Sequence, residues 1–176
     1  MRFARFAAGL ALATLVHLAA TRLWPGWPVA VDLFLVVTVI VARAGRPLEA
    51  LLAGIVAGWT ADALAGGPLG INGLADSTVG YLAALAAQRL VVHRKSSLAG
   101  VFAAAAAAQG VILALLGLLF LAGRELPGPE IVALRAATSA LAGLVWTNLA
   151  GAVGRRFRRK RGPPGGAPDL PKSLLP

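Results

Sequence analysis

The stretch GWTADALAGGPLGINGL, from Gly58 to Leu74, places the carboxylate of Asp62 inside an apolar run. Gly66, Gly67 and Pro68 then interrupt that run. Glycine and proline together are typical of a tight turn. The stretch therefore predicts two apolar helices joined by a short turn, with a charged side chain that has to face protein and not lipid.

The composition extends this interpretation to most of the chain. Of the 176 residues, 58% are hydrophobic and only 14% are charged, which is unlike a soluble domain. A bilayer core about 30 Å thick needs roughly 20 apolar residues for each helical span. We therefore expect an all-α integral membrane protein. The chain has no cysteine, which excludes disulfides and thiolate chemistry.

The apolar runs and the breaks between them predict a bundle of six transmembrane helices. The expected spans are Phe3 to Thr21, Trp24 to Ala42, Leu48 to Ala65, Gly73 to Val92, Leu98 to Ala122 and Ile131 to Val153. The second of these contains Pro25 and Pro28 at its start, so its helix is short if it begins after Pro28. Residues 1–153 are thus expected to form the membrane domain.

The basic residues predict the orientation of these spans. Alternate connections and the two ends of the chain place 14 of the 17 Lys and Arg residues on one side and only Arg22 and Arg124 on the other, while Arg135 lies inside the sixth span. Under the positive-inside rule both termini face the cytoplasm. The first span, preceded by Arg2 and Arg5, also has features of a secretory signal peptide, but no clear cleavage site follows it.

Residues 154–176 are basic and rich in proline and glycine, and we expect them to form a disordered cytoplasmic tail. Six Lys and Arg residues lie in the run RRFRRKR, Arg155 to Arg161. A basic cluster directly after an apolar span is typical of an orientation signal that contacts anionic lipid. We expect no nucleic-acid partner.

Small and polar residues recur at every fourth position in four of the spans, so each set lies along one helix face. The third span carries Gly54, Gly58, Asp62 and Gly66; the fourth Asn72, Asp76, Gly80, Ala84 and Gln88; the sixth Arg135, Ser139, Gly143, Thr147 and Gly151; the first Gly9, Ala13, His17 and Thr21. These faces predict close helix packing around a shared polar interior.

Several charged residues are expected in the outer halves of their spans, namely His17, Asp32, Asp62, Asp76 and Arg135. Because an unpaired charge in the membrane is unfavourable, we expect Arg135 to pair with Asp62 or Asp76. The alternative is that these side chains reach interfacial water. The turn PLGING, Pro68 to Gly73, carries no charge, and Asn72 is placed to cap the following helix.

Signatures of catalysis are absent from the sequence. The two histidines, His17 and His93, are expected at opposite surfaces, and there is no GxSxG, HExxH or GxxxxGK[ST] motif. Asp62 and Asp76 could form a carboxylate pair of the kind used by an intramembrane aspartyl protease or a proton relay. We nevertheless expect a protein without enzymatic activity, metal or cofactor.

The region Gly58 to Leu85, GWTADALAGGPLGINGLADSTVGYLAAL, resembles the bacterial rod-shape-determining MreD family. That family joins a glycine-rich helix bearing an Asp to a PLG(I/L)N turn and a helix with a Gly-Tyr pair. Asp62, Gly70 and Asn72 match this pattern, followed by Gly80 and Tyr81. The size and the layout of spans are similar over roughly the first 155 residues, whereas the basic tail has no counterpart in the pattern.

The resemblance implies a non-enzymatic scaffold of the cell-wall elongation machinery, which maintains cell shape. The implied partner is MreC, a single-span protein with a large periplasmic domain. Through MreC the protein would connect indirectly to the MreB filament, to the peptidoglycan polymerase RodA and to a class B penicillin-binding protein. The family is also similar in fold to substrate-binding subunits of energy-coupling-factor vitamin transporters, and a transporter subunit of this type is the alternative function. The candidate structural and partner-binding residues are Asp32, Gly54, Gly58, Asp62, Gly70, Asn72, Asp76 and Arg135.

Overall fold

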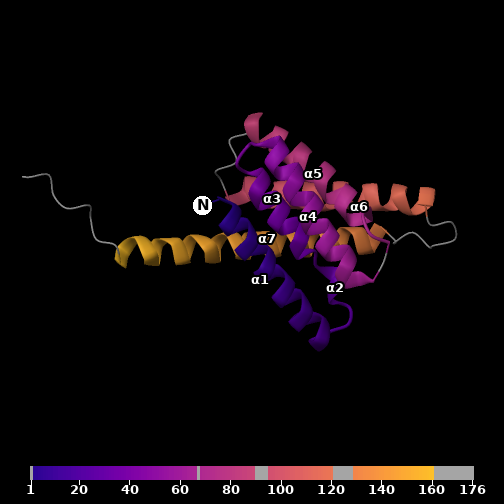
Figure 1. The fold of residues 1–176 in the computed structure, drawn as a ribbon, viewed down its shortest axis with the longest axis horizontal. Helices are drawn as coiled ribbons and strands as arrows, with labels where there is room; N and C mark the ends of the chain where they lie inside the picture. The colour runs from indigo at the N-terminus through magenta and orange to yellow at the C-terminus, as the bar shows by residue number, and fades with distance from the viewer. Residues whose placement is uncertain (1, 67, 90–94, 121–128, 161–176) are drawn as a thin grey trace, which may run out of the picture. The chain divides into compact units, whose positions relative to one another are not determined.

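The computed structural model describes residues 2–66, 68–89, 95–120 and 129–160, and all of its regular structure in these ranges is α-helical (Figure 1). The helices are α1 (Arg2–Leu23), α2 (Trp27–Ala30), α3 (Leu33–Ala42), α4 (Pro47–Ala65), α5 (Ile71–Arg89), α6 (Lys95–Phe120) and α7 (Pro129–Lys160). The chain divides into two compact units, Met1–Leu144 and Val145–Pro176. The first unit contains the core that is described below.

Three helices within the described ranges are long and apolar enough to cross a membrane, Phe3–Leu23, Pro47–Ala65 and Ala99–Leu119. The apolar helix Leu33–Ala42 is shorter. At 1.5 Å per residue its ten residues extend only about 15 Å, roughly half of a hydrocarbon core. Helices are confirmed at each of the six predicted spans, whereas the number of membrane crossings stays a prediction.

The second predicted span, Trp24 to Ala42, is wrong as a single helix. The four-residue helix α2 ends at Ala30, and Val31 and Asp32 are extended before α3 begins at Leu33. Pro28 lies in the first turn of α2, where its missing N–H is tolerated. Asp32 then forms the N-cap of α3. Its carboxylate accepts the N–H groups of Phe34 and Leu35, which in a continuous helix would bond to backbone carbonyls of the preceding turn.

Helices α4 and α5 form an antiparallel hairpin that is held together by glycines (Figure 1). A Cβ atom built on Gly54 would lie 2.4 Å from the carbonyl oxygen of Asp76, and one on Gly58 would lie 2.5 Å from that of Asn72. The predicted close approach at these two glycines is therefore confirmed. Gly66 differs, because it ends α4 in the left-handed conformation and nothing lies within 4 Å of its Cβ position.

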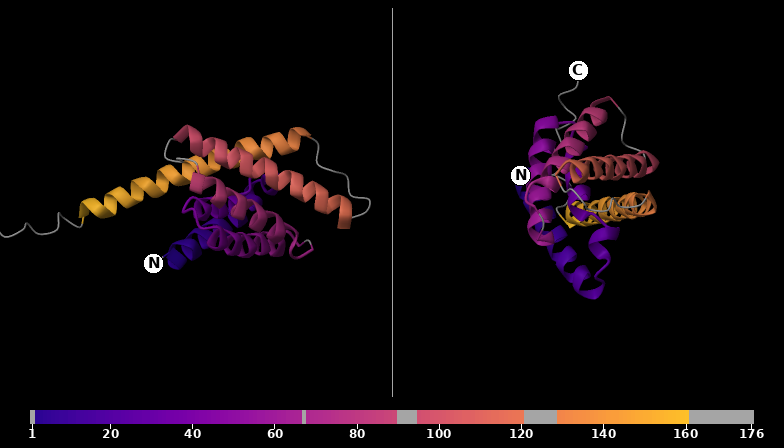
Figure 2. Two further views of the ribbon diagram at one scale, coloured as in Figure 1. Left: turned by 90° about the horizontal axis from the view of Figure 1, so that it is seen from above. Right: turned by 90° about the vertical axis from the view of Figure 1, so that its right-hand side faces the viewer.

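Helix α3 is the most buried element of the first unit. It packs against α1, α4, α5 and α6, and every residue from Ala30 to Val39 is buried. Figure 2 shows α6 crossing beside the α3–α5 group, with which it is in contact. At the end of α3, Gly45 adopts a φ of 65° and lets the chain turn into α4.

The last helix is longer than expected. Helix α7 continues to Lys160, so residues 154–160 are helical and the predicted disordered tail does not begin at residue 154. The physical reason is that Arg and Lys are good helix formers and need no buried surface to continue an existing helix. The remainder of the predicted tail, residues 161–176, lies outside the described residues.

Candidate functional site: a buried polar cluster and a clamped turn

The break between α2 and α3 is the centre of a polar cluster, which we define as the buried residues Asp32, Asp76, Gln109 and Ser139 together with the partly buried Arg135. The Oδ1 atom of Asp32 accepts the backbone N–H groups of Phe34 at 3.1 Å and Leu35 at 3.0 Å. These bonds satisfy two of the free donors at the start of α3. A carboxylate is also favoured at this end of the helix dipole.

Gln109, in the middle of α6, connects the two carboxylates of the cluster. Its Nε2 atom donates to Oδ2 of Asp32 at 2.7 Å and to Oδ1 of Asp76 at 2.6 Å. Gln109 and Asp76 are both fully buried. The amide thus uses both of its hydrogens to join α6, α5 and the α2–α3 break.

Arg135 completes the cluster from α7. Its Nη2 atom lies 2.6 Å from Oδ2 of Asp32, and the Asp32 side chain is only 5% exposed. The prediction that Arg135 pairs with Asp62 or Asp76 is therefore wrong, since its partner is Asp32. Asp32 was not chosen as the partner because the break in the second span, which places this carboxylate in the core, was not predicted.

The same part of α7 also binds the backbone of the break. The hydroxyl of Thr138 donates to the carbonyl of Ala30, and the N–H of Asp32 donates to Oγ of Ser139 at 3.4 Å. Ala30 ends a helix of four residues, so its carbonyl lacks a partner within that helix. Side chains of α7 therefore replace the hydrogen bonds that the broken helix cannot make for itself.

Within the described residues, a few buried polar atoms lack a hydrogen-bond partner. They are His17 Nδ1, Trp27 Nε1, Asp76 Oδ2, Gln109 Oε1 and Arg135 Nε. Three of the five belong to the polar cluster. Such atoms are unusual, because buried polar groups are nearly always paired. The ring of His17 lies beside that of Phe34, with centroids 5.4 Å apart, so this histidine packs next to the cluster.

The second polar arrangement lies between α4 and α5, in residues 68–72, which we call the clamped turn. Asp62 is buried and accepts the N–H of Gly70 at 2.7 Å, the N–H of Asn72 at 3.2 Å and the Nδ2 group of Asn72 at 2.7 Å. Gly70 has a φ of 104°, a conformation that favours glycine. One carboxylate therefore holds the turn with three hydrogen bonds, one to Gly70 and two to Asn72.

The role predicted for Asn72 needs correction. Asn72 does not cap α5, because it lies in the first turn of that helix and its side chain donates to Asp62. The carboxylate of Asp62 performs the capping function from the neighbouring helix, since it accepts two backbone N–H groups at the start of α5. The sequence pattern identified both residues but not which of them was the acceptor.

The eight candidate residues thus separate into three groups. Asp32, Asp76 and Arg135 belong to the polar cluster, whereas Asp62, Gly70 and Asn72 belong to the clamped turn, and Gly54 and Gly58 form the α4–α5 contact. Gln109 was missed. The sequence feature that could have identified it is its position, because Gln109 is a lone amide that follows six consecutive alanines inside a long apolar span.

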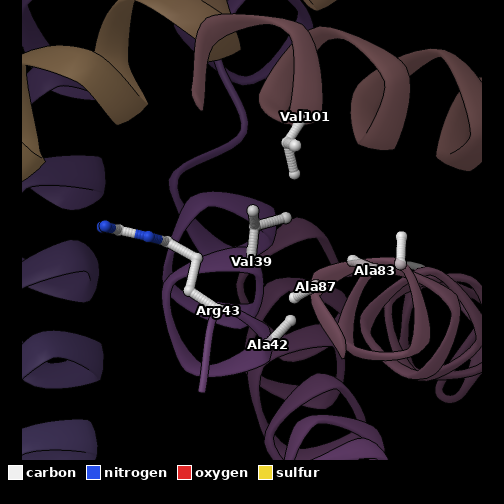
Figure 3. Close-up of a pocket in the computed structure, with 7 residues that line it drawn as sticks. Val39, Ala42, Arg43, Ala83, Ala87 and Val101 are labelled. Carbon is white, nitrogen blue, oxygen red and sulfur yellow. The ribbon is translucent and has the colours of Figure 1, made fainter. Parts of the chain in front are cut away.

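A small pocket lies between α3, α5 and α6, away from the polar cluster. Its volume is about 10 Å³, and it is lined by Val39, Ala42, Arg43, Ala83, Ala86, Ala87 and Val101. Figure 3 shows Val39 and Val101 on opposite sides of it, while the Arg43 side chain extends away from the other labelled residues. A space of this size holds about one water molecule.

The chemistry of the cluster is that of hydrogen bonding and ion pairing. Across the residues that the structure describes, no group of three or more His, Asp or Glu side chains could hold a metal ion. Asp62 and Asp76 do not share a hydrogen bond, since Asp62 binds the turn and Asp76 binds Gln109. The hydrogen bonds of the cluster thus join the α2–α3 break to α5, α6 and α7.

Comparison with known proteins agrees with the resemblance drawn from the sequence. The model of the family described as rod shape-determining protein MreD matches residues 3–129, more than half of the chain. The match includes Asp32, Asp62, Asp76 and Gln109, and it ends before Arg135. No curated protein and no solved structure matches the chain. With its apolar helices and this match, the chain belongs to the MreD family of rod shape-determining membrane proteins.

Proposed function

We propose that this protein is a non-enzymatic scaffold of the cell-wall elongation complex in the bacterial inner membrane. In this role it maintains cell shape by binding MreC, and through MreC it connects to MreB, RodA and a class B penicillin-binding protein. Membership of a family of shape-determining proteins supports this function. The physical basis of this function is a helix bundle in which intramolecular hydrogen bonds hold in place the surfaces that partners would bind.

The proposed topology has six crossings, with α2 and α3 together forming the second. The distribution of basic residues supports cytoplasmic termini, with 14 of the 17 Lys and Arg residues on the cytoplasmic side. In this orientation the clamped turn faces the periplasm. The basic end of α7 faces the cytoplasm, where it would contact anionic lipid headgroups.

The observation that carries the proposal is the clamped turn. Asp62 fixes the backbone at Gly70 and Asn72, directly after Leu69. Leu69 is 75% exposed, and the residue that follows it, Gly70, is held in place by Asp62. A preordered apolar side chain binds a partner without the entropy loss of ordering a loop. This turn is therefore the proposed contact for the periplasmic part of MreC or for the membrane span that precedes it.

Photo-crosslinking in living cells tests the proposal. A photoreactive amino acid at Leu69 should give a covalent product with MreC or another elongation protein. The matched control is Leu82, an exposed apolar residue of α5 that lies outside the turn. Products from Leu82 and none from Leu69 would contradict the assignment of the turn, and no product with an elongation protein from either would contradict the scaffold function.

One observation favours the alternative, a substrate-binding subunit of a vitamin-type transporter. Discontinuous helices with buried polar groups often form ligand sites in transporters, and the α2–α3 break has this character. The pocket between α3, α5 and α6, at about 10 Å³, is far smaller than the 300 Å³ or more that small-molecule sites usually need. Mass spectrometry of the purified protein distinguishes the two functions, because only the transporter subunit should retain a vitamin-like ligand.

A further inference from the structure

The two carboxylates of the polar cluster have very different surroundings. Asp32 accepts four hydrogen bonds, from the N–H groups of Phe34 and Leu35 and from the side chains of Gln109 and Arg135. Asp76 accepts one, from Gln109, and its Oδ2 atom is buried without a partner. An ionised carboxylate needs several donors when it is buried, so Asp32 has the surroundings of a carboxylate and Asp76 does not.

The charged groups near Asp76 also favour its neutral form. The charged groups that act on it are Asp32, Arg135 and Asp62. Arg135 already forms an ion pair with Asp32, and Asp62 is bound by the clamped turn. His17, from α1, is next to Asp32 and contributes no bond to Asp76. An ionised Asp76 would therefore be a second buried negative charge without a cation of its own, which is strongly unfavourable.

The hydrogen-bond geometry provides a place for one proton. The Nε2 group of Gln109 has two hydrogens, and the two carboxylates accept both of them. The Oε1 atom of the same amide is an acceptor that has no donor. A protonated Asp76 has one O–H donor beside one acceptor oxygen, and this pair is complementary to the N–H and C=O of an amide. One proton on Oδ2 would thus give both unpartnered oxygens a hydrogen bond.

We propose that the polar cluster is a binding site for a single proton, which Asp76 holds on Oδ2 and donates to Oε1 of Gln109. The cluster then contains one ion pair, Asp32 with Arg135, and one neutral acid–amide pair, Asp76 with Gln109, and it carries no net charge. A metal cation fits less well, because the two unpartnered oxygens are fewer than a hard cation coordinates. The inference rests on these contacts and does not depend on the proposed scaffold function.

Infrared spectroscopy of the full-length protein in lipid at neutral pH tests the proposal. A protonated carboxylic acid has a C=O stretching band that is separate from the bands of ionised carboxylates and shifts on deuteration. We expect the wild-type protein to show this band. We expect it to be absent from Asp76→Asn, while Asp32→Asn loses ionised-carboxylate bands and keeps it. A wild-type spectrum without a protonated band would overturn the proposal, and that measurement needs no variant.

Two further measurements serve as controls, one for misfolding of the variants and one for binding of a metal ion. Asp76→Asn should keep the melting temperature of the wild type, because the substitution replaces one neutral group with another, whereas Asp32→Asn should lower it by leaving Arg135 unpaired. A large loss of stability in Asp76→Asn alone would contradict a neutral Asp76. If the protonated band disappears when Na⁺ is added, Na⁺ displaces the proton, and the proposal that the site holds a proton in preference to a metal cation is wrong.

Discussion

The clamped turn and the polar cluster both depend on a buried carboxylate that caps the start of a helix, but they are assembled over different distances in the chain. Asp62 binds Gly70 and Asn72, which are 8 and 10 residues away. Asp32 caps its own helix and then binds Gln109 and Arg135, which are 77 and 103 residues away. The first arrangement needs only a helical hairpin, whereas the second needs four separate elements to be in place. We therefore expect damage at Asp32 to affect the whole core and damage at Asp62 to stay local.

Asp32→Ala should have the largest effect. The substitution leaves the partly buried Arg135 guanidinium without a counter-charge and removes the cap of α3. Loss of one partner of a buried ion pair costs about 3–5 kcal/mol of the free energy of unfolding. Denaturant unfolding in detergent measures this value. An effect no larger than that of Asp62→Ala would remove the distinction between the two regions.

Gly54→Ala should have the next largest effect, because it acts on the hairpin that carries both regions. The new Cβ atom would approach the Asp76 carbonyl to 2.4 Å, so α4 and α5 would have to separate. Overpacking of this kind costs about 1–3 kcal/mol. Gly100→Ala in α6 is the matched control, since nothing lies within 4 Å of that position. The control should be neutral or more stable by up to about 1 kcal/mol, and equal losses in both variants would contradict the close approach.

Asp62→Ala should destabilise the protein less, by about 0.5–2 kcal/mol, the range for loss of a helix cap. The Gly70 and Asn72 N–H groups lie at the end of the hairpin and are only partly buried, so water can replace the lost acceptor. The local consequence is faster amide exchange of Gly70 and Asn72, measured by hydrogen–deuterium exchange. Unchanged exchange at the turn would show that Asp62 does not fix it.

Gln88→Ala should have the smallest effect. Gln88 donates to the carbonyl of Gly45 at 2.9 Å across 43 residues, but the bond is exposed to solvent. We expect a change of at most about 1 kcal/mol, since an exposed bond is readily exchanged for a bond to water. Its unfolding free energy, measured beside that of Asp32→Ala, separates the effect of burial from that of distance along the chain. A loss comparable to that of Asp32→Ala would mean that distance and not burial sets the effect.

Particular residues show how far the sequence could predict the site. The four-residue spacing of Gly54, Gly58 and Asp62 predicted a packed helix face, and all three are buried. Arg135 was correctly expected to need a carboxylate, yet the partner chosen was wrong. Spacing along one helix fixes a face, but it says nothing about which residue of another helix meets that face. Gln109 was missed for the same reason, because a neutral amide in an apolar span stands out only when its two carboxylate partners are known.

By itself, the sequence determined an apolar helical protein, the positions of its helices, a glycine-rich hairpin and the family that shares it. These properties follow from composition, periodicity and short-range spacing, which are local along the chain. Only the tertiary structure decided that the second span is broken at Asp32 and that Asp32, Asp76, Gln109 and Arg135 form one cluster. The reason is that a buried polar group requires a partner but does not specify one, and the partner is chosen by how the helices pack.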